Sequence, residues 1–278
     1  MVAAFEGWND AADASSTAAR YLRERWDARP FASIDPEDFF DFSTTRPQVR
    51  LIDGLTREIT WPETELSAAA LPGSQRDVVV LVGTEPQLRW RTFCAEVTGI
   101  AGELGVELVV TLGALLADVA HTRPVRVTGT AADPELVAQL GLQRSAYEGP
   151  TGIVGVLHDA CRQAQIPSAS LWAAVPHYVG GTPSPKAALA LVRRTADLLA
   201  TPLMTTDLEI ASAAYESQVS EVVDEDDDVA GYVRRLELVG DDDDDDDDDG
   251  HAPEGSTGEV DGEQLVADLE RFLREQGE

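Results

Sequence analysis

The sequence predicts an α/β protein in which a mainly parallel sheet is covered by helices on both faces. Four short apolar runs bounded by turn residues are typical of buried strands, at residues 2–5, 78–82, 108–112 and 171–175. Apolar residues at helical spacing follow these runs, at residues 11–26, 89–104, about 152–165 and 185–200. Strands and helices that alternate in this way form parallel sheets with helices packed on them.

Each predicted helix has a single apolar face, which is the face expected to lie on the sheet. In chain order these faces consist of Ala11, Ala14, Ala18 and Leu22; Phe93, Val97, Ile100 and Leu104; Ile153, Val156, Leu157 and Cys161; and Ala188, Leu191, Val192 and Leu199. An intervening segment precedes the third helix, and it contains a predicted strand at residues 124–129 and a short helix at 134–140.

The segment from residue 31 to residue 61 has a different pattern. Partly alternating stretches at 39–42, 49–52 and 57–61 predict antiparallel additions to the sheet. The pair Asp53-Gly54 between the last two stretches is typical of a hairpin turn.

The sequence as a whole divides into four predicted regions. We expect an α/β/α domain over residues 1–203 and a helical extension over 204–237. Nine consecutive aspartates occupy residues 241–249, and like charges at that density favour a disordered acidic linker over 238–262. Apolar residues of the last region, 263–276, share one helical stripe, and a helix this short is expected to dock on another surface.

The net charge of −30 comes mainly from the end of the chain. Residues 216–278 hold 25 acidic residues and 4 arginines, while residues 1–215 hold 26 acidic and 17 basic residues. Such a field repels nucleic acids and anionic membranes, so neither is an expected partner. The absence of a signal-like or membrane-spanning apolar run predicts a cytoplasmic protein. Cys94 and Cys161 fall in apolar helical patterns and are expected to be buried.

Polar residues follow each of the four predicted strands. Because carboxyl ends of parallel strands share one edge of a sheet, we expect a crevice at that edge. The residues gathered there are Glu6, Asn9, Asp10, Glu85 and His177. Glu6, Asp10 and Asp13 could pair carboxylates for acid–base chemistry or hold a cation. Alternatively, Asp10 or Asn9 caps the first helix.

Two further segments carry candidate groups. The stretch from Glu148 to Gly152 opens a helix, with Thr151 as the expected N-cap and free N–H groups that could hold an anion. Alternatively, its glycines permit a tight turn. His121 lies near Asp118 in sequence and is either a general base or a loop residue that holds its own backbone. The sequence contains no cofactor fingerprint or zinc-ligand spacing, so we expect neither a cofactor nor a metal.

Five motifs in a fixed order resemble the bacterial, mainly actinobacterial, branch of the proteasome assembly chaperone 2 family, over about residues 2–236. The motifs are Phe5-Glu6-Gly7-Trp8-Asn9-Asp10-Ala11; Glu85-Pro86 with Trp90-Arg91; His121-Thr122-Arg123-Pro124; Tyr147-Glu148-Gly149-Pro150-Thr151-Gly152-Ile153; and Pro176-His177-Tyr178-Val179 with Ser184-Pro185-Lys186. The stripe of residues 263–276 is also similar to the C-terminal helix of that branch.

The resemblance implies a three-layer α/β/α fold, similar to nucleoside phosphorylases, in a homo-oligomer for which a trimer is expected. It also makes proteasome subunits candidate partners. Archaeal relatives bind through a C-terminal hydrophobic-Tyr-any tail, whereas this sequence ends Glu275-Gln276-Gly277-Glu278.

We therefore expect a non-enzymatic scaffold or chaperone-like protein. The alternative is a hydrolase or nucleoside-phosphorylase-like enzyme that uses the same crevice. The candidate crevice or interface residues are Glu6, Trp8, Asn9, Asp10, Glu85, His121, Arg123, Glu148, Thr151, His177 and Tyr178.

Overall fold

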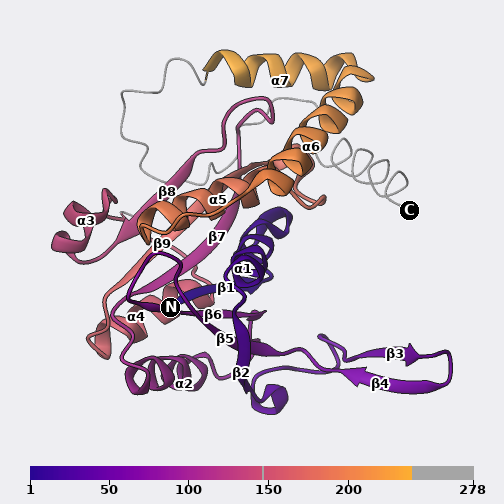
Figure 1. Ribbon diagram of the computed structural model, residues 1–278. Coiled ribbons are helices and arrows are strands. Elements are labelled where there is room, and N and C mark those ends of the chain that lie inside the picture. Colours follow the sequence, from indigo (N-terminus) through magenta and orange to yellow (C-terminus); the bar gives the residue numbers. More distant parts are fainter. Residues whose placement is uncertain (146, 240–278) are drawn as a thin grey trace.

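A computed structural model describes residues 1–145 and 147–239 of the chain (Figure 1). Its centre is a seven-stranded sheet with the strand order β2-β5-β6-β1-β7-β9-β8. The predicted C-terminal helix at 263–276 lies outside the described residues, and so does the predicted acidic linker over 238–262 from residue 240 onward.

The four predicted apolar strands form the middle of this sheet. They are β1 (Val2–Glu6), β6 (Asp77–Thr84), β7 (Val109–Ala117) and β9 (Ser168–Pro176). All neighbouring pairs among them are parallel, and Ala4 of β1 is aligned with Val82 on one side and Leu112 on the other. The prediction of a parallel core is therefore confirmed.

Both edges of the sheet are antiparallel. On one side β5 (Thr64–Ala70) pairs with β6, and β2 (Arg29–Ile34) pairs with β5; on the other side β8 (Val127–Ala131) pairs with β9. The pattern analysis missed β2 and β5, because β5 is rich in alanine and β2 carries a proline, and both features are unfavourable for strands.

The prediction of a strand at residues 39–42 is wrong. A short 3-10 helix, η2 (Pro36–Asp38), precedes this stretch, and Phe39 and Phe40 are buried. The Phe39 ring meets the Phe93 ring edge-on at a centroid distance of 5.3 Å. These aromatic side chains fill the core beside the sheet edge rather than extend the sheet.

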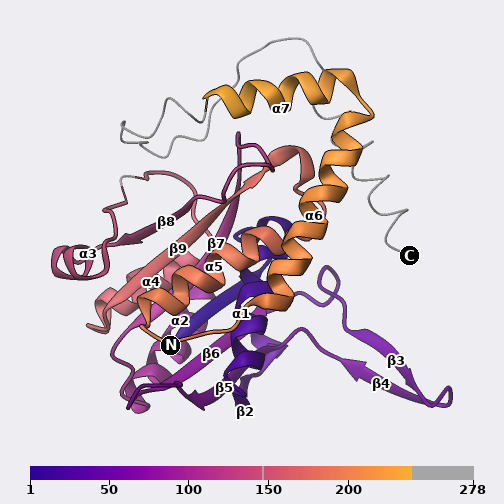
Figure 2. The same cartoon turned by 45° about the horizontal axis from the view of Figure 1, so that its top comes forward.

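The predicted hairpin forms a separate two-stranded sheet. Its strands are β3 (Gln48–Ile52) and β4 (Thr56–Thr60). Asp53 and Gly54 both have positive φ angles, 51° and 71°, which is the backbone that this dipeptide favours in hairpins. Figures 1 and 2 show the hairpin extending away from the main body.

Helices cover both faces of the central sheet, which confirms the three-layer α/β/α class (Figure 1). The helices α1 (Ala14–Arg25) and α5 (Pro185–Leu198) belong to one apolar core. The helices α2 (Trp90–Glu103) and α4 (Ile153–Gln163) belong to the other. The short helix α3 (Pro134–Leu140) lies beside β8.

The helical extension consists of α6 (Thr206–Asp224) and α7 (Asp227–Val239). Tyr215 and Val219 of α6 share a third apolar cluster with Val233 of α7 and with Tyr178, which lies in the 3-10 helix η3 (His177–Val179) after β9. This cluster joins the extension to the carboxyl end of the sheet. Among the described residues, no helix is long and apolar enough to cross a membrane.

Candidate functional site

The carboxyl ends of β1 and β6 lie side by side and carry two glutamates. The Glu85 N–H donates a hydrogen bond to the Glu6 carbonyl oxygen at 2.8 Å. The Glu6 carboxylate accepts a hydrogen bond from Thr84 Oγ1 at 3.0 Å and forms an ion pair with Arg20 of α1. Glu6 is half-exposed, so these contacts connect the strand ends to α1 at the surface.

The Glu85 carboxylate connects three segments that are distant in sequence. Its Oε1 accepts hydrogen bonds from Asn9 Nδ2 at 3.3 Å and from the backbone N–H of Ile153 at 2.8 Å. Ile153 is the first residue of α4. A carboxylate at the positive end of a helix dipole is favourable, so Glu85 caps α4 from the loop that follows β6.

The prediction that Thr151 caps α4 is wrong. The N-cap is Gly152, and its position has no side-chain cap of its own. A Cβ atom on Gly152 would lie 2.2 Å from Asn9 Nδ2 and 2.8 Å from Glu85 Oε1. The glycine is therefore required by the close approach of Asn9 and Glu85. The sequence left open that free N–H groups here hold an anion. In the structure the Glu85 carboxylate accepts the Ile153 N–H at this helix end.

The N-cap residue of α1 is Asp13, but the side chain that caps the helix is that of Asp10, three residues earlier. Asp10 Oδ1 accepts hydrogen bonds from Ser15 N and Ser15 Oγ, both at 2.6 Å, and from Ser16 N at 3.1 Å. A 3-10 turn, η1 (Ala11–Asp13), separates Asp10 from α1 and contains two residues with positive φ, Ala12 and Asp13. The capping interpretation of Asp10 is confirmed.

The same carboxylates create local repulsion. Burial raises the pKa of Asp13, and the negative charges of Asp10 and Glu6 raise it further. Asp10 Oδ2 is buried without a hydrogen-bond partner among the described residues. This corner of the molecule therefore has an excess of negative charge.

A second polar cluster lies between the sheet and α6. His121 is buried; its N–H donates to Tyr178 Oη at 2.8 Å, and its Nδ1 lies 2.8 Å from the same oxygen. His121 Nε2 lies 3.0 Å from Ser220 Oγ of α6. Burial lowers the pKa of His121, and the nearby Lys186 lowers it further. A neutral, enclosed imidazole of this kind holds α6 on the body.

Arg123 and His177 also face the extension. The Arg123 guanidinium donates to the Glu237 carbonyl oxygen of α7 at 2.6 Å. His177 Nδ1 lies 3.1 Å from Asp118 Oδ1, without good hydrogen-bond geometry. The His177 ring also packs edge-on against Tyr178 and Tyr232.

The predicted site residues therefore fall into two groups. Glu6, Asn9, Asp10 and Glu85 gather at the ends of β1 and β6. His121, Arg123, His177 and Tyr178 gather under α6 and α7. His177 was expected in the first group, but its described contacts place it in the second. Trp8 and Glu148 are exposed.

His158 was not among the predicted residues. It lies in α4, with Nε2 at 2.9 Å from Thr111 Oγ1 of β7 and Nδ1 at 2.9 Å from Ser168 Oγ of β9. Burial lowers its pKa to about 4. The only sequence signal is its place one residue after Leu157, on the border of the apolar face of the helix. His158 connects α4 to two strands.

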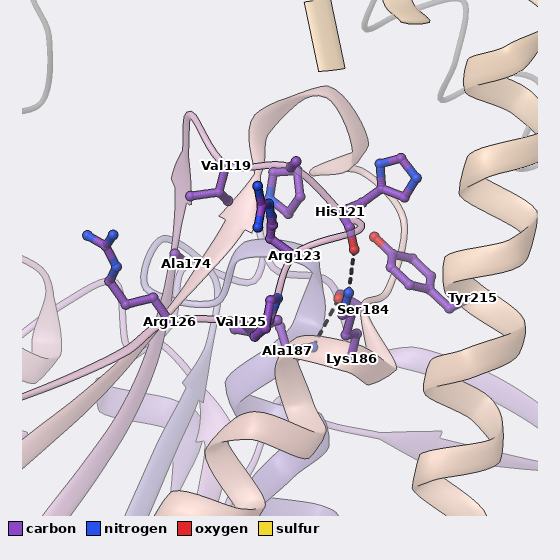
Figure 3. Close-up of a pocket in the computed structure, with 13 residues that line it drawn as sticks. Val119, His121, Arg123, Val125, Arg126, Ala174, Ser184, Lys186, Ala187 and Tyr215 are labelled. Carbon is purple, nitrogen blue, oxygen red and sulfur yellow. Dashed lines mark hydrogen bonds between the residues drawn. The ribbon is translucent and has the colours of Figure 1, made fainter. Parts of the chain in front are cut away.

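One pocket opens beside the second cluster (Figure 3). Its walls include His121, Arg123, Ser184, Lys186 and Tyr215. Lys186 Nζ donates to the His121 carbonyl oxygen and to Glu216, as part of the contact between the loop and α6. The cavity volume of about 20 Å³ accommodates roughly one water molecule.

Residues 1–145 and 147–239 contain no group of three or more His, Cys, Asp or Glu side chains that could hold a metal ion. Burial raises the pKa of Cys94 to about 12 and that of Cys161 to about 11, so both thiols stay protonated at neutral pH.

Comparison with known protein families shows which family the chain belongs to. The pattern of the PAC2 family matches residues 4–223. The chain belongs to the PAC2 family. Among curated proteins, none matches it.

Solved structures support the assignment. A PAC2 family protein from Streptomyces avermitilis is 51% identical, with a TM-score of 0.79, over 84% of this chain and 98% of that one. A proteasome-assembly chaperone homologue from Mycobacterium tuberculosis is 49% identical, with a TM-score of 0.76 and the same coverage. An archaeal proteasome activator from Pyrococcus furiosus is 18% identical over 80% of this chain and 91% of that one, with a TM-score of 0.64, and shares the fold.

Proposed function

We propose that this PAC2 family member is a non-enzymatic, oligomeric scaffold or chaperone-like protein of the cytoplasm that takes part in proteasome assembly. Its partners are other copies of the same chain and subunits of the proteasome. The 49% identity to a proteasome-assembly chaperone homologue supports this partner class.

The proposal rests on the hydrogen bonds that the polar motif residues make within the fold. Glu85 and Asp10 each accept backbone hydrogen bonds at the start of a helix. His121 is held between Tyr178 and Ser220. A catalytic base needs access to a substrate proton and a pKa near the working pH. These groups instead hold helices on the sheet, which favours a structural role for the motifs and leaves binding to the outer surface.

Reconstitution tests the proposal directly. Separately purified proteasome α and β subunits from the source organism would be mixed with and without this chain, and assembly would be followed by native mass spectrometry. We expect a faster rise of the assembled particle and a complex of this chain with at least one subunit. An unchanged time course with no complex would contradict the proposed function.

An enzyme that uses the first cluster is the competing candidate, and Asp10 Oδ2 is the observation in its favour, since a buried carboxylate oxygen without a partner can mark a ligand contact. A thermal-shift screen with nucleosides, inorganic phosphate and divalent cations distinguishes the two. A shift that disappears selectively in Glu85→Gln, together with turnover of the ligand, would favour the enzyme.

A further inference from the structure

The hairpin formed by β3 and β4 has one apolar face and one polar face. We call residues 46–61 the arm. In an antiparallel pair, directly opposed residues lie on the same face and successive pairs alternate between faces. One face therefore carries the pairs Val49–Ile59 and Leu51–Arg57, and the other carries Gln48–Thr60, Arg50–Glu58 and Ile52–Thr56. Trp61 continues the apolar face by the same alternation.

The apolar face of the arm is uncovered. The exposed fractions are 59% for Val49, 63% for Leu51, 53% for Ile59 and 45% for Trp61. A two-stranded hairpin without a core is at best marginally stable in water, and an exposed apolar patch marks an interaction surface. Within residues 1–145 and 147–239, β3 and β4 pair with each other and with no other strand. Such a face would gain free energy from burial against a partner.

The base of the arm is anchored to the body. The Trp61 ring packs edge-on against Phe42 at a centroid distance of 4.9 Å, and Phe42 packs against the core that contains Phe39 and Phe93. The arm therefore projects from a fixed point on the body (Figure 2).

The charge of the arm indicates the kind of partner. Residues 46–61 contain three arginines, at 46, 50 and 57, against Asp53 and Glu58. Residues 1–215, which exclude the acidic end of the chain, hold 26 acidic and 17 basic residues. A positively charged arm on an acidic body is attracted to the acidic surface of another copy. Pairing of two arms would instead bring arginines together.

The carboxyl edge of the sheet offers a complementary surface. Trp8 and Leu115 are exposed there, by 66% and 45%. The Asn9 carbonyl oxygen accepts a hydrogen bond from Ala114 N at 2.9 Å, which places the neighbouring residues Trp8 and Leu115 at the same edge.

Carboxylates at this edge can meet the arginines of the arm. Glu6 ends β1, Asp118 directly follows β7, and Asp13 ends the 3-10 turn η1 between β1 and α1. The charges of Asp10 and Glu6 raise the pKa of Asp13, after the larger effect of burial, so an approaching cation would relieve repulsion at this corner.

We propose that the arm of one copy docks, by its apolar face, on the Trp8–Leu115 surface of a second copy. This inference rests on the self-association included in the proposed function and names the two surfaces that make the contact. The contact joins two different patches, so repetition around an axis closes a ring if the rotation allows it, and a trimer is one such ring.

A pair of matched variants tests the role of the apolar face. Val49→Asp with Ile59→Asp places two charges on that face, whereas Gln48→Asp with Thr60→Asp places the same charges on the neighbouring pair of the polar face. Light scattering of the wild type should give a multiple of 29.9 kDa. We expect the apolar-face variant to raise the concentration needed for assembly at least about tenfold, and the polar-face variant to retain the wild-type mass.

Each outcome has a separate meaning. A wild-type mass near 29.9 kDa at micromolar concentration would overturn both the self-association and the docking. An oligomer that persists in the apolar-face variant would overturn the docking and leave the self-association intact. Circular dichroism of both variants confirms that the body is folded.

Cysteine cross-linking identifies the acceptor surface. The native thiols are buried with raised pKa values, so they give little background. Leu51→Cys protein is mixed with Leu115→Cys protein under a mild oxidant. We expect a disulfide-linked dimer in the mixture and little in either protein alone. A dimer in Leu51→Cys alone would show that arms pair with each other, and no dimer in the mixture would reject this acceptor surface.

Discussion

The polar cluster at the ends of β1 and β6 differs from the β3–β4 arm in which side chains are buried. In the cluster, Asn9 and Asp10 are buried, and Glu85 bonds to two other segments of the chain. In the arm, Val49 and Leu51 are more than half exposed, although they are among the most apolar residues of that region. Polar groups are enclosed in one region, and apolar groups are open to solvent in the other.

This difference separates two kinds of requirement. Buried polar groups need partners, and Asn9, Asp10 and Glu85 find most of theirs within the same chain. Exposed apolar groups gain from burial, and those of the arm find none within the described chain. The buried residues of the distinctive motifs therefore stabilise the fold, while exposed apolar residues, in the arm and at Trp8, are the better candidates for contact with other molecules.

The largest expected effect comes from crowding the cluster. Gly152→Ala places a Cβ against Asn9 and Glu85 and breaks their hydrogen bonds, including the cap of α4. We expect the free energy of unfolding to fall by about 3 kcal/mol, the order expected for buried groups left unpaired. Urea denaturation measures the change.

Gly102→Ala is the matched control for this substitution. Gly102 lies in α2, where an added Cβ meets nothing within 4 Å, so alanine should stabilise the helix by about 0.5–1 kcal/mol. Equal effects of the two substitutions would show that the cluster is loosely packed.

A pH dependence should follow from His158. Its pKa is lowered to about 4 in the fold, whereas an unfolded histidine titrates near about 6.5. The unfolded chain therefore binds the proton first as pH falls. The stability linked to neutral His158 is complete above about pH 6.5 and is lost toward pH 4, by about 2 kcal/mol at pH 5.

Denaturation of the wild type and His158→Gln at pH 7 and pH 5 measures this contribution. The variant should lose part of the pH dependence of the unfolding free energy. The remaining pH dependence is expected to include that of His121, whose pKa is also lowered. An identical slope in both proteins would mean that His158 is solvated.

A smaller effect is expected at the exposed rim of the cluster. Glu6→Ala removes the ion pair with Arg20 and the hydrogen bond from Thr84, but both Glu6 and Arg20 are partly exposed. We expect a loss of less than about 1 kcal/mol, because solvent screens such pairs. Glu6→Gln should recover part of it in thermal denaturation. A loss as large as that of Gly152→Ala would place Glu6 among the enclosed groups.

The smallest effect is expected in the arm. Leu51→Ala removes a side chain that is 63% exposed, so the unfolding free energy in dilute protein should change by no more than about 0.5 kcal/mol. Denaturation at low and high protein concentration checks this. A large loss in the dilute monomer would show that the arm packs on its own body.

The sequence by itself determined the layered fold, because buried parallel strands and amphipathic helices have distinct periods. The four central strands and their helices appear in the predicted places, and Asp53-Gly54 forms the predicted turn. The capping role of Asp10 was also predictable, since it precedes an apolar helical pattern. These features depend on residues that are close in sequence.

Only the tertiary structure decided which distant groups meet. Glu85 caps α4, 68 positions further along the chain, and displaces Thr151 from the expected role. His177 joins Asp118 and Tyr232 instead of Glu6, because α6 and α7 pack over the end of β9. The sequence also did not predict that the arm is exposed. Alternation assigns Val49 and Ile59 to one face, but only the surrounding chain determines whether that face is covered.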